Sequence, residues 1–279
     1  MILSELIPFL KTLETRPKRS LSQNFLIDPN IVLKIIELAK IDPGEPVLEI
    51  GPGPGALTKA LLDAKARVFA VEMDPVFARE LQRLQNGNLA IFQDDFLKFP
   101  MEFLPKKIKV VANLPYHITA PILEKLFGSS FSKIVIMVQA EVADRMKAAP
   151  GSKDYGSLSL FTQFHTKVSG SFRVPAACFY PRPKVDSKVI SLDAVPLPEI
   201  NPFPLIRQAF QKRRKMLTSS LLQVPKDRLL QSLSDLGIRT DARPEMISLE
   251  QWLQLSGALL EAEISMGNTK SAGLNSLYF

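Results

Sequence analysis

Several residue types are scarce in this chain of 279 residues, and each scarcity excludes a class of protein. The single cysteine, Cys178, excludes an internal disulfide framework and a cysteine-rich zinc site. With only two histidines, His117 and His165, we expect no histidine-rich centre and therefore no bound metal. Low cysteine usage is typical of a reducing compartment, which predicts a cytoplasmic protein.

Long hydrophobic runs are also missing. No stretch approaches the roughly 18 uncharged apolar residues of a membrane-spanning helix, so we expect no membrane partner. Glu5, Lys11 and Glu14 interrupt the apolar start of the chain before the core of an export signal could form. The sequence is nevertheless 46% hydrophobic, which is enough for a substantial core and excludes long-range disorder.

Positive charge is present in excess and is unevenly distributed. The formal net charge is +7, and nine basic residues against three acidic ones lie between Arg207 and Arg243. A local basic excess favours a polyanionic partner, usually nucleic acid. A solvated helical face is the alternative explanation of the same pattern.

The first two thirds of the chain alternate between strand and helix patterns. Short apolar runs predict strands at 46–50, 67–71, 89–93, 108–112 and 133–138, and helical spacing predicts helices at 31–40, 58–64, 77–84 and 121–127. Alternation of this kind predicts an α/β fold with a mostly parallel, Rossmann-like sheet. Ligands bind at the carboxyl ends of such strands.

The pattern changes near residue 195, where four prolines between Pro196 and Pro204 mark a linker. Helical spacing follows at 205–222, 226–236 and 249–263. We therefore predict a catalytic domain at 1–195, a small all-helical basic domain at 196–264 and a flexible tail at 265–279.

A glycine loop follows the first predicted strand. Gly51, Gly53 and Gly55 let the backbone turn sharply against a ligand, and Glu72 lies 21 residues after Gly51, where a carboxylate can bind both hydroxyls of a ribose. These features predict an adenosine-containing cofactor, either NAD or S-adenosylmethionine. Two details favour S-adenosylmethionine. Glu49 can face a cationic ligand, and the prolines after the first two glycines remove N–H groups that a pyrophosphate needs.

The tetrapeptide Asn113-Leu114-Pro115-Tyr116 follows the fourth predicted strand. The amino group of a purine is a poor nucleophile, because its lone pair is delocalised into the ring. The Asn113 side-chain oxygen and the Leu114 carbonyl can each accept one N–H bond from that amine, and Pro115 directs the carbonyl inward. Tyr116 offers a face on which an extruded base can stack. Positioning against an activated methyl group supplies most of the rate.

With these residues in view, the sequence resembles the ribosomal RNA adenine N6,N6-dimethyltransferase family, and most closely its bacterial small-subunit branch. The resemblance covers roughly residues 16 to 260. It rests on segments that occur in the family's order, at 23–26, 48–55, 71–74, 94–97, 113–116, 155–159 and 179–187.

The resemblance implies a Rossmann-like class I S-adenosylmethionine-dependent methyltransferase fold. It also implies a cofactor site covered by the segment 1–27, with Asp94 as an alternative to Asp95 for the adenine amino group. The implied cofactor residues are Asn24, Leu26, Gly51, Gly53, Glu72, Met73, Asp95, Phe96 and Asn113. The implied catalytic residues are Asn113, Leu114, Pro115, Tyr116 and Phe179, with Tyr116 and Phe179 enclosing the flipped adenine from its two faces.

Two basic segments are expected to bind RNA phosphates. One comprises Arg16, Lys18 and Arg19. The other is a predicted basic helix with Lys212, Arg213, Arg214 and Lys215, of which two or three would face the RNA, because four successive residues cannot share one helix face. Such contacts position RNA without reading its sequence.

The leading hypothesis is the dimethylation of two adjacent adenines in small-subunit (16S) ribosomal RNA. The substrate would be an immature 30S subunit late in assembly, and nothing demands more than a monomer. Four alternatives are a large-subunit methyltransferase conferring antibiotic resistance, a DNA adenine methyltransferase, a non-catalytic RNA-binding assembly factor and an NAD oxidoreductase.

Overall fold

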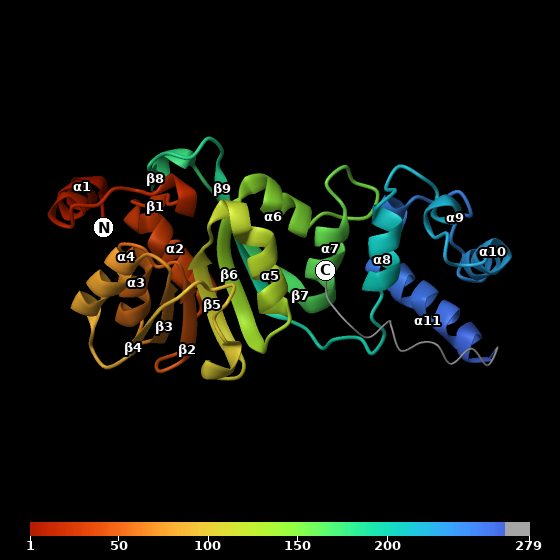
Figure 1. Ribbon diagram of the computed structural model, residues 1–279, viewed down its shortest axis with the longest axis horizontal. Coiled ribbons are helices and arrows are strands. Elements are labelled where there is room, and N and C mark those ends of the chain that lie inside the picture. The colour runs from red at the N-terminus through yellow and green to blue at the C-terminus, as the bar shows by residue number, and fades with distance from the viewer. Residues whose placement is uncertain (266–279) are drawn as a thin grey trace. The chain divides into compact units, whose positions relative to one another are not determined.

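The structure is a computed structural model that describes residues 1–265 (Figure 1). The chain divides into two compact units, one comprising Met1–Ala143 with Lys167–Ala194 and the other comprising Asp144–Thr166 with the residues from Val195 onward. The division after Ala194 lies beside the predicted domain boundary, but Asp144–Thr166 groups with the C-terminal helices. Except for Ser265, the predicted tail lies outside the described residues.

A seven-stranded sheet forms the centre of the first unit. Its strand order is β4-β3-β2-β5-β6-β9-β7, with β2 to β6 parallel and β9 antiparallel to β6. The strands are β2 (Pro46–Ile50), β3 (Arg67–Glu72), β4 (Leu89–Gln93), β5 (Ile108–Asn113), β6 (Phe131–Gln139), β7 (Thr166–Val174) and β9 (Ser187–Ala194). The chain runs from β2 outward to β4 and then returns to β5 on the other side of β2. This reversal of strand order opens a crevice at the carboxyl ends of the strands.

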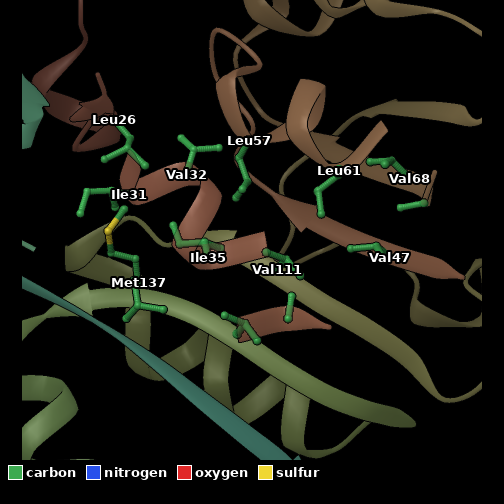
Figure 2. Packing of buried hydrophobic residues seen from close by; sticks show 14 of the residues in the cluster. Leu26, Ile31, Val32, Ile35, Val47, Leu57, Leu61, Val68, Val111 and Met137 are labelled. Atoms are coloured by element: carbon green, nitrogen blue, oxygen red, sulfur yellow. The ribbon is translucent and has the colours of Figure 1, made fainter. Parts of the chain in front are cut away.

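Helices α2 (Pro29–Ala39) and α3 (Ala56–Asp63) cover one face of the sheet. Helix α2 begins at Pro29 because the Asp28 side chain accepts a hydrogen bond from the Asn30 backbone N–H at 2.9 Å. Figure 2 shows the core beneath these helices, where α2 and α3 side chains pack on strand residues such as Val47 and Val111. Burial of each such side chain contributes roughly 1.5–3 kcal/mol. Helices α4 (Pro75–Glu80) and α5 (Thr119–Phe127) follow β3 and β5 in the chain.

The N-terminal segment is joined to the rest of the first unit by a two-stranded ribbon that the sequence pattern did not predict. Helix α1 (Leu3–Thr12) precedes β1 (Phe25–Leu26), which pairs antiparallel with β8 (Phe179–Tyr180). The Ile27 backbone N–H extends the pairing by donating to the Cys178 carbonyl at 2.9 Å. The pairing therefore holds the chain before β1 next to the chain after β8.

The second unit is helical and contains the fully buried Trp252. Its helices are α7 (Ser157–His165), α8 (Phe203–Phe210), α9 (Leu217–Ser220), α10 (Lys226–Asp235) and α11 (Leu249–Ser265), while α6 (Ala140–Met146) crosses the boundary between the units. Short 3-10 helices lie at Arg19–Leu21, Leu81–Leu84, Met101–Phe103, Tyr116–Ile118, Ala176–Cys178 and Pro244–Met246. Every helix among the described residues is too short or too polar to span a bilayer.

The single helix predicted over 205–222 is wrong. Helix α8 ends at Phe210, residues 211–215 form turns, and α9 begins at Leu217. In a helix, Lys212 and Lys215 would be neighbours on one face, where like charges repel each other. The turn is held by the Arg213 guanidinium, which donates to the backbone carbonyls of Lys153 at 3.0 Å and Tyr155 at 2.7 Å. The predicted basic helix is therefore a basic turn.

Candidate active site

A cavity lies at the carboxyl ends of β2, β3, β4 and β5, where the strand order reverses. The N-terminal segment closes one side of it through residues 21–25. The structure brings together at this cavity most of the site residues predicted from the sequence, namely Asn24, Gly51, Gly53, Glu72, Met73, Asp94, Asp95, Phe96, Asn113, Leu114, Pro115 and Tyr116.

The glycine loop leaves open space beside its backbone. Gly51 has a φ of +65°, and a Cβ atom built there would meet no heavy atom within 4 Å. Gly53 has a φ of +54°, and its Cβ would approach the Phe25 ring to 3.1 Å. Both backbones thus need glycine, and the space at Gly51 fits a ligand lying directly against the main chain.

Glu72 ends β3 with its carboxylate almost fully buried. One oxygen accepts from the Gly53 backbone N–H at 2.8 Å and the other accepts from the Asp74 backbone N–H at 2.7 Å. Burial raises the pKa of this carboxyl, and the hydrogen bonds from Asp74 and Gly53 partly oppose the rise. Each carboxylate oxygen can accept more than one hydrogen bond, so both remain able to bind the hydroxyls of a ribose.

Glu49 is a second buried acid beside the glycine loop. Residues alternate across β2, so Glu49 faces the same side as Val47, the side covered by α2 and α3. It lines a smaller cavity together with Gly51 and Asn113. Its Oε2 atom has no hydrogen-bond partner among the described residues, and burial raises its pKa to about 8. A buried acid with one carboxylate oxygen left unpartnered among the described residues fits a ligand that carries a positive charge.

Asn113 ends β5, and its side-chain amide has a defined orientation. Its Nδ2 atom donates to the Asn24 backbone carbonyl at 3.1 Å. A carbonyl oxygen can only accept, so the amide must present nitrogen to Asn24 and keep its Oδ1 atom available as an acceptor. The next residue, Leu114, is fixed by a hydrogen bond from its backbone N–H to the Met137 carbonyl at 3.1 Å.

The Tyr116 ring is held from its hydroxyl end. The phenolic oxygen lies 2.5 Å from the Oγ atom of the buried Ser187, the first residue of β9. Burial raises the pKa of Tyr116, and the bond to Ser187 opposes the rise. The ring therefore lies between the end of β5 and the start of β9 as a neutral aromatic surface.

Asp94 and Asp95 both line the cavity, so either can face a bound adenine. Each carboxylate already accepts a backbone hydrogen bond. Asp94 accepts from the Asp95 N–H at 2.7 Å, and Asp95 accepts from the Leu97 N–H at 3.0 Å. Asp95 is the more buried of the two, and Phe96 beside it is buried.

Two residues predicted for the site do not line the main cavity. Leu26 lines the smaller cavity instead. Phe179 is only 3% exposed and belongs to the core cluster that contains α2 and α3 side chains. The two residues are partners in the β1–β8 ribbon, which places both against that core. Of the two rings, Tyr116 lines the main cavity and Phe179 does not, and their enclosure of a flipped adenine stays a prediction.

The predicted RNA-binding residues lie in both units. Arg16 and Arg19 are exposed, whereas the Lys18 Nζ atom lies 2.9 Å from the carboxylate of the buried Asp74. In the second unit, Arg213 is bound to backbone carbonyls, and its exposed neighbours are Lys212, Arg214 and Lys215. Lys18 and Arg213 thus stabilise the fold locally. Among the described residues, no three His, Cys, Asp or Glu side chains are grouped as metal ligands would be.

Comparisons with known proteins agree with this geometry. The model of the family described as "Ribosomal RNA adenine dimethylase" matches residues 14–260. A ribosomal RNA small subunit methyltransferase A from Protochlamydia amoebophila is 45% identical over 276 residues, covering 93% of this chain and 97% of the relative.

Two solved structures share the fold over most of the chain. A dimethyladenosine transferase from Plasmodium falciparum aligns with a TM-score of 0.74 and 28% identity, covering 87% of this chain and 98% of the other. The 23S rRNA methyltransferase ErmE aligns with a TM-score of 0.67 and 29% identity, covering 85% and 99%. These matches confirm the predicted fold class and the predicted use of S-adenosylmethionine. The chain belongs to the ribosomal RNA adenine dimethylase family.

Proposed function

We propose that this chain transfers methyl groups from S-adenosylmethionine to N6 of two adjacent adenines in 16S ribosomal RNA, placing two methyl groups on each. The observation that carries the proposal is the orientation of Asn113, whose amide nitrogen is bound to the Asn24 carbonyl at 3.1 Å and whose Oδ1 atom is left as an acceptor. An acceptor at this point suits the N–H group of an incoming adenine amine.

The protein's part in the reaction is to hold the amine. The Asn113 Oδ1 atom and the Leu114 carbonyl each accept one N–H bond, which pyramidalises the nitrogen and aims its lone pair along the cavity. Tyr116, held by Ser187 at 2.5 Å, stacks on the extruded base. S-adenosylmethionine, when bound, supplies a methyl group that its sulfonium already activates. Because no strong base is needed to start, positioning provides most of the rate.

The cofactor residues follow from the cavity. We assign the ribose hydroxyls to Glu72 and the adenine amino group to Asp95, with Asp94 as the alternative. Gly51 would hold the methionine part, because a Cβ atom built there meets no heavy atom within 4 Å. Asn24, Met73 and Phe96 line the same cavity and complete its walls.

For the substrate, we propose the immature 30S subunit late in its assembly, acted on by a monomer in the cytoplasm. The name of the Protochlamydia relative supports the small subunit over the large one. In the helical unit, the exposed Lys212, Arg214 and Lys215 are the side chains available for RNA phosphates. The large-subunit activity named for ErmE is not favoured, because that structure is 29% identical whereas the relative named as a small-subunit methyltransferase is 45% identical.

The proposal is tested by replacing Asn113 with alanine. Asn113→Ala should lower methyl transfer to unmodified small subunits by at least about a hundredfold. The variant loses both the Oδ1 acceptor and the hydrogen bond from Nδ2 to the Asn24 carbonyl. Binding of the subunit should change little. Asn30→Ala, at an exposed position on α2, is the matched control and should keep full activity. An Asn113→Ala protein with wild-type turnover would contradict the proposed chemistry.

A further inference from the structure

A groove adjoins the methyl-transfer cavity and carries a strong positive charge. Its basic lining residues are Arg16, Lys18, Arg19, Arg182 and Lys184, and no acidic residue lies among the described residues that line it. The chain 16–24 forms one wall and the loop 181–185 forms the other. Arg182 and Lys184 have no part in the methyl-transfer geometry described above.

The β1–β8 ribbon explains why these two segments line the same groove. Phe25 of β1 pairs with Tyr180 of β8 in antiparallel register. The residues just before β1 and just after β8 therefore leave the same end of the ribbon together. Two basic segments that lie far apart in the sequence are thus brought together in the lining of one groove.

One of the five basic side chains is already neutralised. The Lys18 Nζ atom lies 2.9 Å from the Asp74 carboxylate, and the Gln23 side-chain amide donates to the same carboxylate at 3.0 Å. Gln23 also accepts a hydrogen bond from the Lys18 backbone N–H at 2.7 Å. These bonds fix the N-terminal wall next to Glu72, which accepts from the Asp74 N–H. Lys18 therefore holds the N-terminal wall in position.

The other four basic side chains are exposed, and none forms an ion pair with another described residue. Asp186 follows the 181–185 loop in the chain, and Arg182 is one of the charges that lower its pKa, but its carboxylate is hydrogen-bonded to other groups. It pairs with Arg173 at 2.6 Å and accepts from the Ala176 backbone N–H at 2.8 Å. Arg16 and Arg19 on one wall and Arg182 and Lys184 on the other are thus available to an anion.

The groove leads directly to the target-base position. Ser22, Gln23, Asn24, Tyr116 and His117 line both the groove and the cofactor cavity. A polymer lying in the groove could therefore place one of its units at Tyr116. A nucleic-acid strand has regularly spaced anions, which suit the basic lining, and flat bases, which can stack on Tyr116. An acidic peptide offers only the anions.

We propose, on the basis of the function proposed above, that this groove holds the sugar-phosphate backbone of the unpaired RNA strand that carries the target adenines. Arg16 and Arg19 contact phosphates from one wall, and Arg182 and Lys184 contact phosphates from the other. The strand is single because a base in a duplex must leave its stack to reach Tyr116. These contacts hold the strand in place, and they carry no sequence information.

The test compares two double variants, R16Q/R19Q and R182Q/K184Q, with the double variant K34Q/K167Q. Lys34 and Lys167 are exposed residues outside the groove lining, so this control removes the same charge. The dissociation constant is measured over a salt series with unmodified small subunits and with a short single-stranded RNA that contains two adjacent adenines. Binding of S-adenosylmethionine, measured by calorimetry, checks that each variant is folded.

Each groove variant should lose about 1.4 from the slope of log Kd against log salt concentration, because each phosphate contact of a single strand contributes about 0.7. The loss should occur with both probes, and the control should keep the wild-type slope. Groove variants that match the control would overturn the proposal, even if the wild-type protein methylates the subunit. A loss seen with subunits but not with the RNA would overturn it in favour of a protein partner. A wild-type protein that binds the subunit without methylating it would refute the proposed function and leave the groove result standing.

Discussion

Glu49 provides a quantitative prediction, because burial raises its pKa from 4.5 to about 8. The unfolded chain releases this proton above about pH 4.5, while the folded protein keeps it until about pH 8. Between these values the folded state binds more protons than the unfolded state, so stability falls as the pH rises. The stability linked to Glu49 is therefore fully present at low pH and is lost as the pH rises through the folded pKa.

The variant Glu49→Gln removes this pH dependence while keeping the shape of the side chain. Each pKa unit corresponds to about 1.4 kcal/mol, so holding the proton near pH 7, about 2.5 units above the unfolded pKa, costs the wild type about 3 kcal/mol. We expect the ligand-free variant to be more stable than the wild type by up to that amount near pH 7. The difference should fall to about 1 kcal/mol near pH 5.

Urea unfolding followed by far-UV circular dichroism measures this difference. Fluorescence is unsuitable, since the single tryptophan, Trp252, lies in the second unit, whereas Glu49 lies in the first. Glu37→Gln, at an exposed position on α2, is the control and should leave the stability profile unchanged. If the stability of Glu49→Gln relative to wild type did not vary between pH 5 and pH 7, the folded protein would not hold the Glu49 proton in this pH range.

Two further predictions concern the ring of Tyr116, on which the target base would stack, and the hydrophobic core. Tyr116→Phe keeps the stacking surface and loses only the 2.5 Å bond to Ser187, so kcat/KM should fall less than about tenfold. Tyr116→Ala should lose the roughly 1–3 kcal/mol of stacking as well. Methyl-transfer kinetics on small subunits distinguish the two variants, and equal losses of kcat/KM would argue against stacking. Leu61→Ala, in the fully buried core shown in Figure 2, should lower the free energy of unfolding by roughly 2–5 kcal/mol in a urea titration, while Leu33→Ala at an exposed position of α2 should be nearly neutral.

The sequence predicts the central sheet well because its strands are short apolar runs bounded by turn residues. The strands Pro46–Ile50 and Leu89–Gln93 have the bounds that the pattern indicates. Their order along the chain places Gly51, Glu72 and Asn113 at one edge, since parallel strands share their carboxyl ends. Most of the cofactor cavity is therefore predictable from residue types at strand ends.

What the sequence could not predict depends on contacts between distant segments. The β1–β8 ribbon has two residues in each strand, too few to show an alternating pattern. That ribbon places Phe179 in the core and brings Arg182 into the same groove as the N-terminal segment. In the same way, charge alone marks Lys18 and Arg213 as RNA contacts, although one pairs with Asp74 and the other binds backbone carbonyls.

The proposed reaction and its substrate are both tested by methyl incorporation from labelled S-adenosylmethionine into unmodified small ribosomal subunits. Large subunits and duplex DNA are treated in parallel, and the nucleic acid is digested to identify the labelled nucleoside. We expect N6,N6-dimethyladenosine in the small subunit alone. Label confined to the large subunit would contradict the proposed substrate, and the absence of label from every substrate, with S-adenosylmethionine still bound, would contradict the proposed reaction.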